Sequence, residues 1–237
     1  MGRRLKRKQM KQDEFISMVD RIIHWIGGNW RQLAVGVGVA AAVGLLYWGA
    51  TAFLTRRTEA ASQAMETALE TFSAPVGSAA PADAKVRFAT DAERLSAAEK
   101  AFSDIKSRYS LTPQAKVAEL CLAHIAADRG DEAGAIRTLG ELTSKRSSDP
   151  IVRAAMLDLV RLRIAKGEGL QLTKELEDMA SGSDPRLPRD VAVYELAQVW
   201  DHEGKPEEAA KMYRNLVENF PDSMYRYEAQ QHLSSSS

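Results

Sequence analysis

The 237-residue sequence contains one cysteine, Cys121, so no disulfide can form within the chain. Leucines flank this cysteine, which favours a buried thiol over a reactive one. The four histidines lie far apart, and none has the H-E-x-x-H spacing of a zinc site. A glycine-rich phosphate loop and the G-x-S-x-G motif of a serine nucleophile are also missing. We therefore predict no catalytic residue, no metal site and no cofactor, and we expect a binding protein and not an enzyme.

The formal net charge is zero, but the charge is unevenly distributed. Residues 1–31 contain eight basic and three acidic residues, so they carry five surplus positive charges and residues 32–237 carry five surplus negative ones. Nucleic-acid-binding proteins present basic surfaces, and we therefore predict no nucleic-acid partner for the acidic part. The basic N-terminus either contacts anionic lipid headgroups or follows from the preference of basic residues for the cytoplasmic side of a membrane.

One long uncharged run is present, residues 33–54 (LAVGVGVAAAVGLLYWGATAFL). As a helix it measures roughly 33 Å, enough to cross a hydrocarbon core of about 30 Å. We predict a single transmembrane helix over residues 32–55, with Tyr47 and Trp48 near one interface. Eight basic residues precede the run and only two follow it directly. The N-terminus is therefore expected in the cytoplasm, and everything after the span on the other side of the membrane.

A cleaved signal peptide is the alternative to this anchor, because Ala50-Thr51-Ala52 resembles an A-x-A cleavage site. Signal peptides, however, have short basic regions and apolar cores of about 7–15 residues, so an uncleaved anchor is favoured. Within the span, Gly36, Ala40 and Gly44 share one helix face. Small residues at this spacing let a second helix pack closely, although glycine and alanine are common in such spans.

The segments beside the span also have helical patterns. Apolar residues recur at helical spacing over residues 15–26, which predicts an amphipathic helix in the membrane interface that ends at Gly27-Gly28-Asn29. Residues 1–12 are expected to be disordered. The segments that follow the span are predicted to be a helix over 61–72, which no breaker separates from the span, then a loop over 74–84 and a second helix over 86–109.

The rest of the chain repeats every 37 residues, as Gly130, Gly167 and Gly204 show. Equivalent apolar positions before and after each glycine keep the same period. Each unit is typical of two helices joined at the glycine, because a helix C-terminus commonly needs a positive φ angle there. We predict an all-α fold in which residues 56–237 form an α-solenoid of helical hairpins. A capping helix from Ser223 to Leu233, with Ser223 as its N-cap, is expected to close it.

The last unit is similar to the tetratricopeptide repeat, with matching residues Leu196, Ala197, Trp200, Gly204, Ala209, Tyr213, Leu216 and Pro221. The unit around Gly130 keeps part of the motif, whereas Arg163 and Leu172 depart from it in the middle unit.

Together with the basic tail, the amphipathic helix and the single span, these repeats make the chain resemble the YfgM-like ancillary subunits of the bacterial SecYEG translocon. The resemblance implies a single-pass protein of the bacterial inner membrane whose tetratricopeptide-repeat-like domain lies in the periplasm. It also implies association with the translocon and with a membrane-anchored periplasmic chaperone.

The first helices of stacked hairpins line a concave face. The repeat register places six candidate protein-binding residues there: Leu120, His124, Leu157, Arg161, Tyr194 and Gln198. Tyr194 is the strongest single candidate, while packing on neighbouring helices is an equal alternative for Leu120 and Leu157. Repeat domains that clamp a C-terminal carboxylate have lysine and asparagine on this face, so that mode of capture is not expected.

Two functions fit these features. The first is a non-enzymatic scaffold that binds proteins beside the translocon and its chaperones, without a small-molecule substrate. The second is a structural subunit of another envelope assembly, for division, secretion or respiration. A soluble enzyme released by cleavage at Ala52 is a third hypothesis, which a mature form beginning near Phe53 would support.

Overall fold

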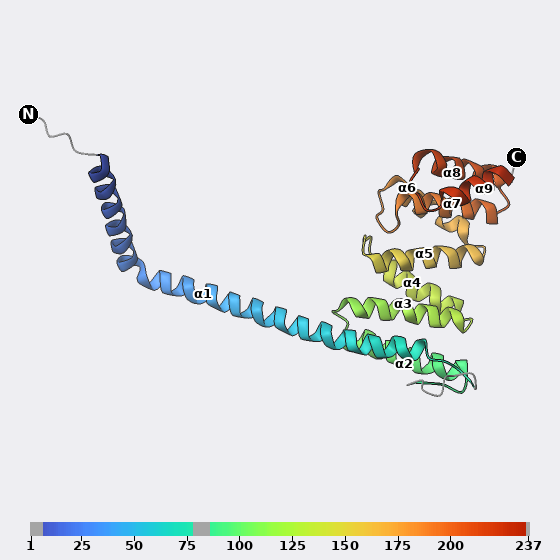
Figure 1. The fold of residues 1–237 in the computed structure, drawn as a ribbon, viewed down its shortest axis with the longest axis horizontal. Helices are drawn as coiled ribbons and strands as arrows, with labels where there is room; N and C mark the ends of the chain where they lie inside the picture. Colours follow the sequence, from blue (N-terminus) through green and yellow to red (C-terminus); the bar gives the residue numbers. More distant parts are fainter. Residues whose placement is uncertain (1–6, 78–85, 236–237) are drawn as a thin grey trace, which may run out of the picture. The chain divides into compact units, whose positions relative to one another are not determined.

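The computed structural model describes the backbone of residues 7–77 and 86–235, with side chains from Asn29 onward except Leu33. Within these ranges the protein is helical, apart from one isolated bridge between Val76 and Phe88, which confirms the all-α prediction (Figure 1). The chain divides into an N-terminal unit ending at Arg56 and a C-terminal unit beginning at Arg57. The two units are described separately below.

Helix α1 (Arg7–Phe72) contains the predicted amphipathic segment, the predicted span and the helix that follows it. Asn29 has non-helical angles (φ −118°, ψ 17°), so the expected break after the glycine pair is a kink and not a loop. Residues 7–12, which were predicted to be disordered, belong to the helix. Residues 1–6, the rest of that predicted segment, lie outside the described range.

The N-terminal unit presents its apolar side chains outward. The segment of α1 from Asn29 to Phe72 is the one helix in the described part of the chain that is apolar enough to cross a membrane. None of the side chains in its most apolar window is buried within the protein, and Leu46 and Tyr47 are 74% and 73% exposed. Such a surface is stable only where lipid or another apolar surface covers it.

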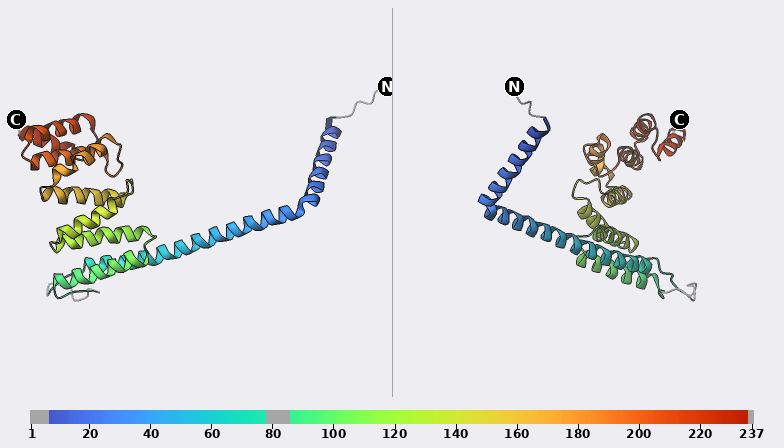
Figure 2. Two further views of the ribbon diagram at one scale, coloured as in Figure 1. Left: turned by 180° about the vertical axis from the view of Figure 1, so that it is seen from behind. Right: turned by 60° about the vertical axis from the view of Figure 1, so that its left-hand side comes forward.

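The C-terminal unit begins with the end of α1 and continues with paired helices that stack side by side (Figure 2). The first helices of successive pairs are the end of α1, α3, α5 and α7, and the second helices are α2, α4, α6 and α8. Their bounds are α2 Asp91–Arg108, α3 Pro113–Asp128, α4 Glu132–Thr143, α5 Pro150–Ala165, the 3-10 helix η1 Gly169–Leu172, α6 Thr173–Ser181, α7 Arg189–His202, α8 Pro206–Asn219 and α9 Arg226–Ser235.

The glycines of the 37-residue period end the first helices, as predicted. Gly130, Gly167 and Gly204 have φ angles of +79°, +74° and +67°, which an L side chain rarely adopts. Asp131 then caps α4 by accepting a hydrogen bond from the Gly134 backbone N–H. In the middle unit the short 3-10 helix η1 precedes α6. This is the unit whose sequence departs from the repeat motif.

Two predicted helix starts were wrong by several residues. Helix α2 begins at Asp91 and not at Val86, because the Thr90 hydroxyl caps it by accepting from the Glu93 backbone N–H, and the Glu93 carboxylate accepts from the Ala89 backbone N–H before the helix. Helix α9 begins at Arg226 and not directly after Ser223. The Ser223 hydroxyl instead accepts from the Tyr225 backbone N–H within the preceding turn and donates to Asp190 of α7.

Three apolar clusters form the core, and each extends over neighbouring hairpins. The first joins α1, α2 and α3 around Phe102, the second joins α3 to α7 around Met156, and the third joins α7, α8 and α9 around Leu216. Cys121 packs against the first cluster, and burial raises the pKa of its thiol, which keeps it protonated and unreactive. Since each cluster shares a helix with the next, the core runs the length of the solenoid.

Candidate protein-interaction surface

The six predicted interaction residues fall into two positions of the repeat. Leu120, Leu157 and Tyr194 occupy one position, and His124, Arg161 and Gln198 occupy the position four residues later. Leu120 and Leu157 are partly buried and pack against the second core cluster. These two side chains therefore contribute to the core, and their role in binding stays a prediction.

Polar contacts connect each first helix to the next. His124 Nε2 lies 2.8 Å from Asp158 Oδ2, and Arg161 donates to Glu195 Oε1 over 2.9 and 3.0 Å. The Tyr194 hydroxyl donates to Glu228 over 2.5 Å. In all three contacts the partners are 34 residues apart, three fewer than the repeat period. Adjacent first helices are therefore offset by about one helical turn, and we call these contacts the inter-repeat ladder.

The contact between Arg161 and Glu195 is the most buried rung of the ladder. The Glu195 side chain is 1% exposed and that of Arg161 is 50% exposed. Burial raises the pKa of Glu195, and Arg161 opposes that increase. Arg161 also donates to the Tyr225 hydroxyl at 3.3 Å, so it joins α5 to α7 and to the turn before α9.

Tyr194 is covered by the C-terminal helix region. It is 6% exposed, and its ring stacks on Tyr225 with the centroids 4.2 Å apart. Burial raises the pKa of the Tyr194 hydroxyl, and the bond to Glu228 raises it further. The favoured candidate contact therefore packs against the turn before α9. Its role in binding stays a prediction.

Gln198 is also held by contacts to a neighbouring helix. Its Nε2 donates to the Tyr213 hydroxyl at 2.8 Å, and that hydroxyl donates to Asp201 at 2.6 Å. The ring of His232 in α9 stacks on Tyr213. Polar side chains of α7 are thus held by bonds to α8 and by packing of α9, which restricts their motion.

Three of the six predicted residues line one cavity. Its volume is about 360 Å³, and its lining residues are Arg161, Ile164, Ala165, Tyr194, Glu195, Gln198 and His202. The structure does not bring Leu120, His124 or Leu157 to this cavity. Because Arg161 and Glu195 neutralise each other, the cavity offers apolar surface and the Gln198 amide more than net charge.

A second groove lies between α1 and α3, and sequence analysis missed it. This α1–α3 groove has a volume of about 530 Å³ and is lined by Ser62, Met65, Glu66, Leu69, Glu70, Ser73 and Gln114. The sequence signal that could have indicated this groove is Leu69, which lies between Glu66 and Glu70 on α1. Leu69 is 43% exposed, which is unusual beside the core positions Met65 and Ala68.

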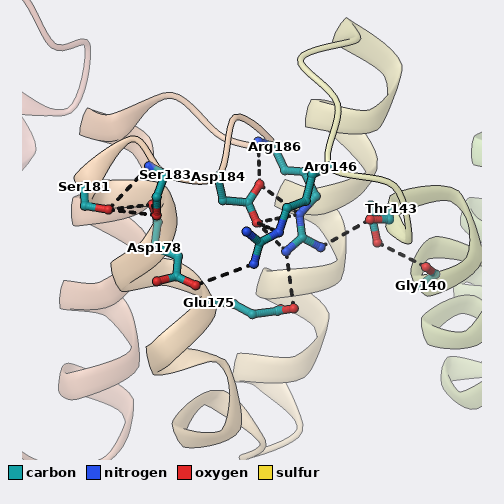
Figure 3. Close-up of polar contacts among 9 residues, drawn as sticks. All are labelled: Gly140, Thr143, Arg146, Glu175, Asp178, Ser181, Ser183, Asp184 and Arg186. Carbon is teal, nitrogen blue, oxygen red and sulfur yellow. Dashed lines mark hydrogen bonds and ion pairs between the residues drawn. The ribbon is translucent and has the colours of Figure 1, made fainter.

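A buried ionic cluster holds the turn between α6 and α7 (Figure 3). Arg186 donates to both carboxylate oxygens of Asp184, to the Thr143 carbonyl at the end of α4 and to Glu175 of α6. The Asp184 side chain is fully buried and that of Arg186 is 8% exposed. Arg146 lies 3.5 Å from the same Asp184 carboxylate. The cluster joins two hairpins and is structural, because its charges are paired inside the protein.

The small residues of the predicted span have no packing partner within the described chain. A Cβ atom added at Gly36 or Gly44 would have no atom within 4 Å. The described residues contain no group of three or more side chains that could hold a metal ion.

Paired helices with glycine-ended first helices and an inter-repeat ladder define a helical-repeat scaffold, a class that binds proteins and is typically not catalytic. The chain belongs to the tetratricopeptide repeat-like domain family, whose model matches residues 24–183, about two thirds of the sequence. A second model, of the tetratricopeptide repeat, matches residues 191–223. Comparison with curated proteins and with solved structures gives no match. The first match extends over the apolar segment of α1 as well as the first hairpins.

Proposed function

We propose that this protein is a single-span scaffold of the bacterial inner membrane, with a cytoplasmic N-terminus and a periplasmic repeat domain, and that it assists the Sec translocon and membrane-anchored periplasmic chaperones. The domain boundaries of this proposal are residues 1–31 for the tail and interfacial helix, 32–55 for the span and 56–237 for the repeat domain. Binding of protein partners is the part that the family itself supports.

The observation that carries the proposal is the exposed apolar surface of α1 joined to a repeat fold. The most apolar window of the helix has a mean hydropathy of 1.9 and no buried side chain. A bilayer would cover this surface, and the paired helices that follow would then be held at the membrane. The surplus of five positive charges before the span supports the proposed orientation.

Cross-linking in native membranes followed by mass spectrometry tests the proposal. Cross-links from the repeat domain to translocon subunits support the accessory role. Cross-links to one stoichiometric, unrelated assembly would instead support the structural-subunit alternative. Release of the protein by alkali, or digestion of the repeat domain only by a protease on the cytoplasmic side, would contradict the anchor or its orientation.

A double substitution of glycine by isoleucine, Gly36→Ile with Gly44→Ile, tests whether the span packs on a partner helix. A Cβ atom added at either position has no atom within 4 Å among the described residues, so we expect the substitutions to leave the rest of the chain undisturbed. Loss of co-purifying membrane proteins is the expected result if this face binds a helix. An unchanged set of partners would rule out the small-residue face.

A further inference from the structure

The α2–α3 turn (residues 109–112) lies beside the part of α1 that directly follows the predicted span. Arg57 and the turn belong to the same unit, and Arg57 donates a hydrogen bond to the Arg108 carbonyl at the end of α2. The predicted span ends at residue 55, so Arg57 follows it by two helical residues, which measure about 3 Å. The headgroup layer on each side of a bilayer is about 5–8 Å thick. The predicted span therefore puts Arg57, and with it the end of α2, within this layer.

The starts of the later first helices lie at the same end of the repeat domain. Gln114 in the first turn of α3 donates to Ser62 of α1, and Lys116 binds Asp149, the N-cap of α5. The glycine turns, such as that at Gly130, lie at the other end of these helices. The chain thus enters the repeat domain at the end that carries the turns between hairpins, and the α2–α3 turn is the first of these.

The α2–α3 turn presents a leucine at its tip. Tyr109 packs against the first core cluster, and Thr112 is 4% exposed and donates its hydroxyl to the Tyr109 carbonyl at 2.8 Å. These contacts hold both sides of the turn in place, while Leu111 between them is 74% exposed. A single exposed leucine is common on protein surfaces. This one, however, is held outward by an ordered turn at the point where the chain leaves the predicted span.

The surroundings of Leu111 are basic. Residues 104–112 contain two basic residues and one acidic residue, and Arg57 adds a further positive charge. The Arg108 side chain is 72% exposed, and its ion pair with Asp104 is long, at 3.9 Å. Guanidinium groups match the geometry of phosphate oxygens. The turn therefore combines an apolar side chain with an accessible phosphate-binding group, as the surface of an anionic bilayer requires.

We propose that the α2–α3 turn is a second membrane contact of this protein, in which Leu111 inserts between lipid headgroups and Arg108 binds their phosphates. This inference rests on the proposed membrane anchor and adds a lipid-binding surface on the repeat domain. One leucine and one arginine bind a bilayer weakly by themselves. Here the span keeps the turn at the bilayer, so the contact forms within one molecule and a weak surface is enough. The contact limits the directions in which the later hairpins can project from the membrane.

Fluorescence quenching in lipid nanodiscs tests the proposal on the full-length protein. A small dye is attached at Ser110→Cys in a Cys121→Ala background, which leaves Leu111 and Arg108 intact. The nanodiscs contain phosphatidylcholine, a smaller share of phosphatidylglycerol and a lipid with a nitroxide quencher on its headgroup. We expect this lipid to quench the dye at position 110. A dye at Gln171→Cys, an exposed site in η1 near the glycine end of its hairpin, should not be quenched.

The quenched fraction gives the ratio of contacting to detached turns, which variants should change. Leu111→Ser should lower this ratio roughly tenfold, because the turn loses its apolar group. The matched control Leu170→Ser, also an exposed leucine but in η1, should leave it unchanged. Arg108→Gln keeps the backbone carbonyl that Arg57 contacts and should lower the ratio roughly fivefold. Nanodiscs of phosphatidylcholine alone should show the same loss, and Arg108→Gln should then have little further effect.

The proposal is overturned if the dye at position 110 is not quenched, or if Leu111→Ser and Leu170→Ser lower the quenching equally. A dye at Val43→Cys, with a nitroxide in the lipid acyl chains, reports on the span itself. Quenching at position 43 without quenching at position 110 leaves the anchor standing while the turn assignment fails, and no quenching at either position contradicts the anchor as well.

A photoreactive residue in place of Leu111 tests for a protein occupant in native membranes. Cross-links from this position to another protein, together with no quenching in nanodiscs, would show that a protein covers the turn and that the lipid contact is wrong. Quenching in nanodiscs together with the absence of such cross-links is the result that we expect.

Discussion

Replacing Arg186 by methionine should destabilise the C-terminal unit strongly. Methionine keeps most of the side-chain volume but removes the guanidinium group that binds Asp184, Glu175 and the Thr143 carbonyl. The Asp184 carboxylate, whose side chain is fully buried, would then lose its main partner. A buried charge without a partner is far less stable than a buried pair.

The expected cost follows from the burial of the pair. Breaking a buried ion pair from one side costs about 3–5 kcal/mol. The lower end applies here, because Arg146 remains 3.5 Å from Asp184. We therefore expect about 3 kcal/mol for Arg186→Met. The double variant that adds Asp184→Asn should recover about 1–2 kcal/mol, since it removes the isolated charge.

The pH dependence gives a second signature of the same contact. Burial raises the pKa of Asp184, but hydrogen bonds from the side chain and backbone of Arg186 lower it, and the result is a pKa below the ordinary value. Stability from this shift is present above the unfolded-state pKa of about 3.9 and is lost as the pH falls through the folded-state pKa. The difference between wild type and Arg186→Met should therefore be full at neutral pH and shrink under acidic conditions.

Urea unfolding of the full-length protein in nonionic detergent, followed by circular dichroism, measures these changes. The reasoning is refuted if Arg186→Met loses less than about 1 kcal/mol, the typical cost of an average substitution. It is equally refuted if the cost of Arg186→Met and the cost of Asp184→Asn alone simply add in the double variant.

Three further predictions concern the ladder, the turns and the core. The hydrogen bond that His124 donates to the Asp158 carboxylate raises the pKa of His124, so its contribution to stability is present below the unfolded-state pKa of about 6.5 and is lost as the pH rises through the folded-state pKa. Since the two side chains are half-exposed, His124→Gln should change the pH dependence of unfolding by less than about 1 kcal/mol, and a larger change would show that the contact is not screened by solvent. Gly204→Ala should lower the free energy of unfolding by about 1–2 kcal/mol, because Gly204 has a positive φ. Gly140→Ala, which also has free space around it but lies inside a helix, should raise it by about 0.5–1 kcal/mol. Equal effects in thermal unfolding would contradict the role of the turn. Phe102→Ala should cost about 3–5 kcal/mol, because the ring is fully buried in the first core cluster, and a near-neutral result would show that this cluster rearranges around the cavity.

Sequence alone could predict the hairpins because local rules determine them. The 37-residue glycine period and the apolar columns on either side of it depend on helix geometry within one unit. The start of α2 was misplaced although its signal was present, since Thr90 and Glu93 have the spacing of a capping box. The start of α9 had no comparable signal, because the Ser223 hydroxyl is used in a contact with Asp190, which is 33 residues away.

The interaction surface was less predictable, because it depends on how neighbouring units pack. The repeat register identified His124 and Arg161 as equivalent, but not that each would pair with an acid of the following unit. The repeat register favours Tyr194 as a binding contact, and only the folded structure shows that Tyr225 stacks on its ring. The α1–α3 groove was missed because its lining combines α1 with Gln114 of α3, which lies 52 residues after its hydrogen-bond partner Ser62.

The constant offset of the ladder has a consequence for how such a chain can change its length. His124 and Arg161 occupy equivalent places, and so do the acids that they contact, Asp158 and Glu195. Removing one complete 37-residue unit would bring His124 opposite Glu195, so a basic group would still meet an acidic one. Deletions or insertions of other lengths within a unit would place these groups on different helix faces. Whole units can therefore be removed with the contacts between basic and acidic groups kept. Changes of any other length would break these contacts and destabilise the stacking of the helices.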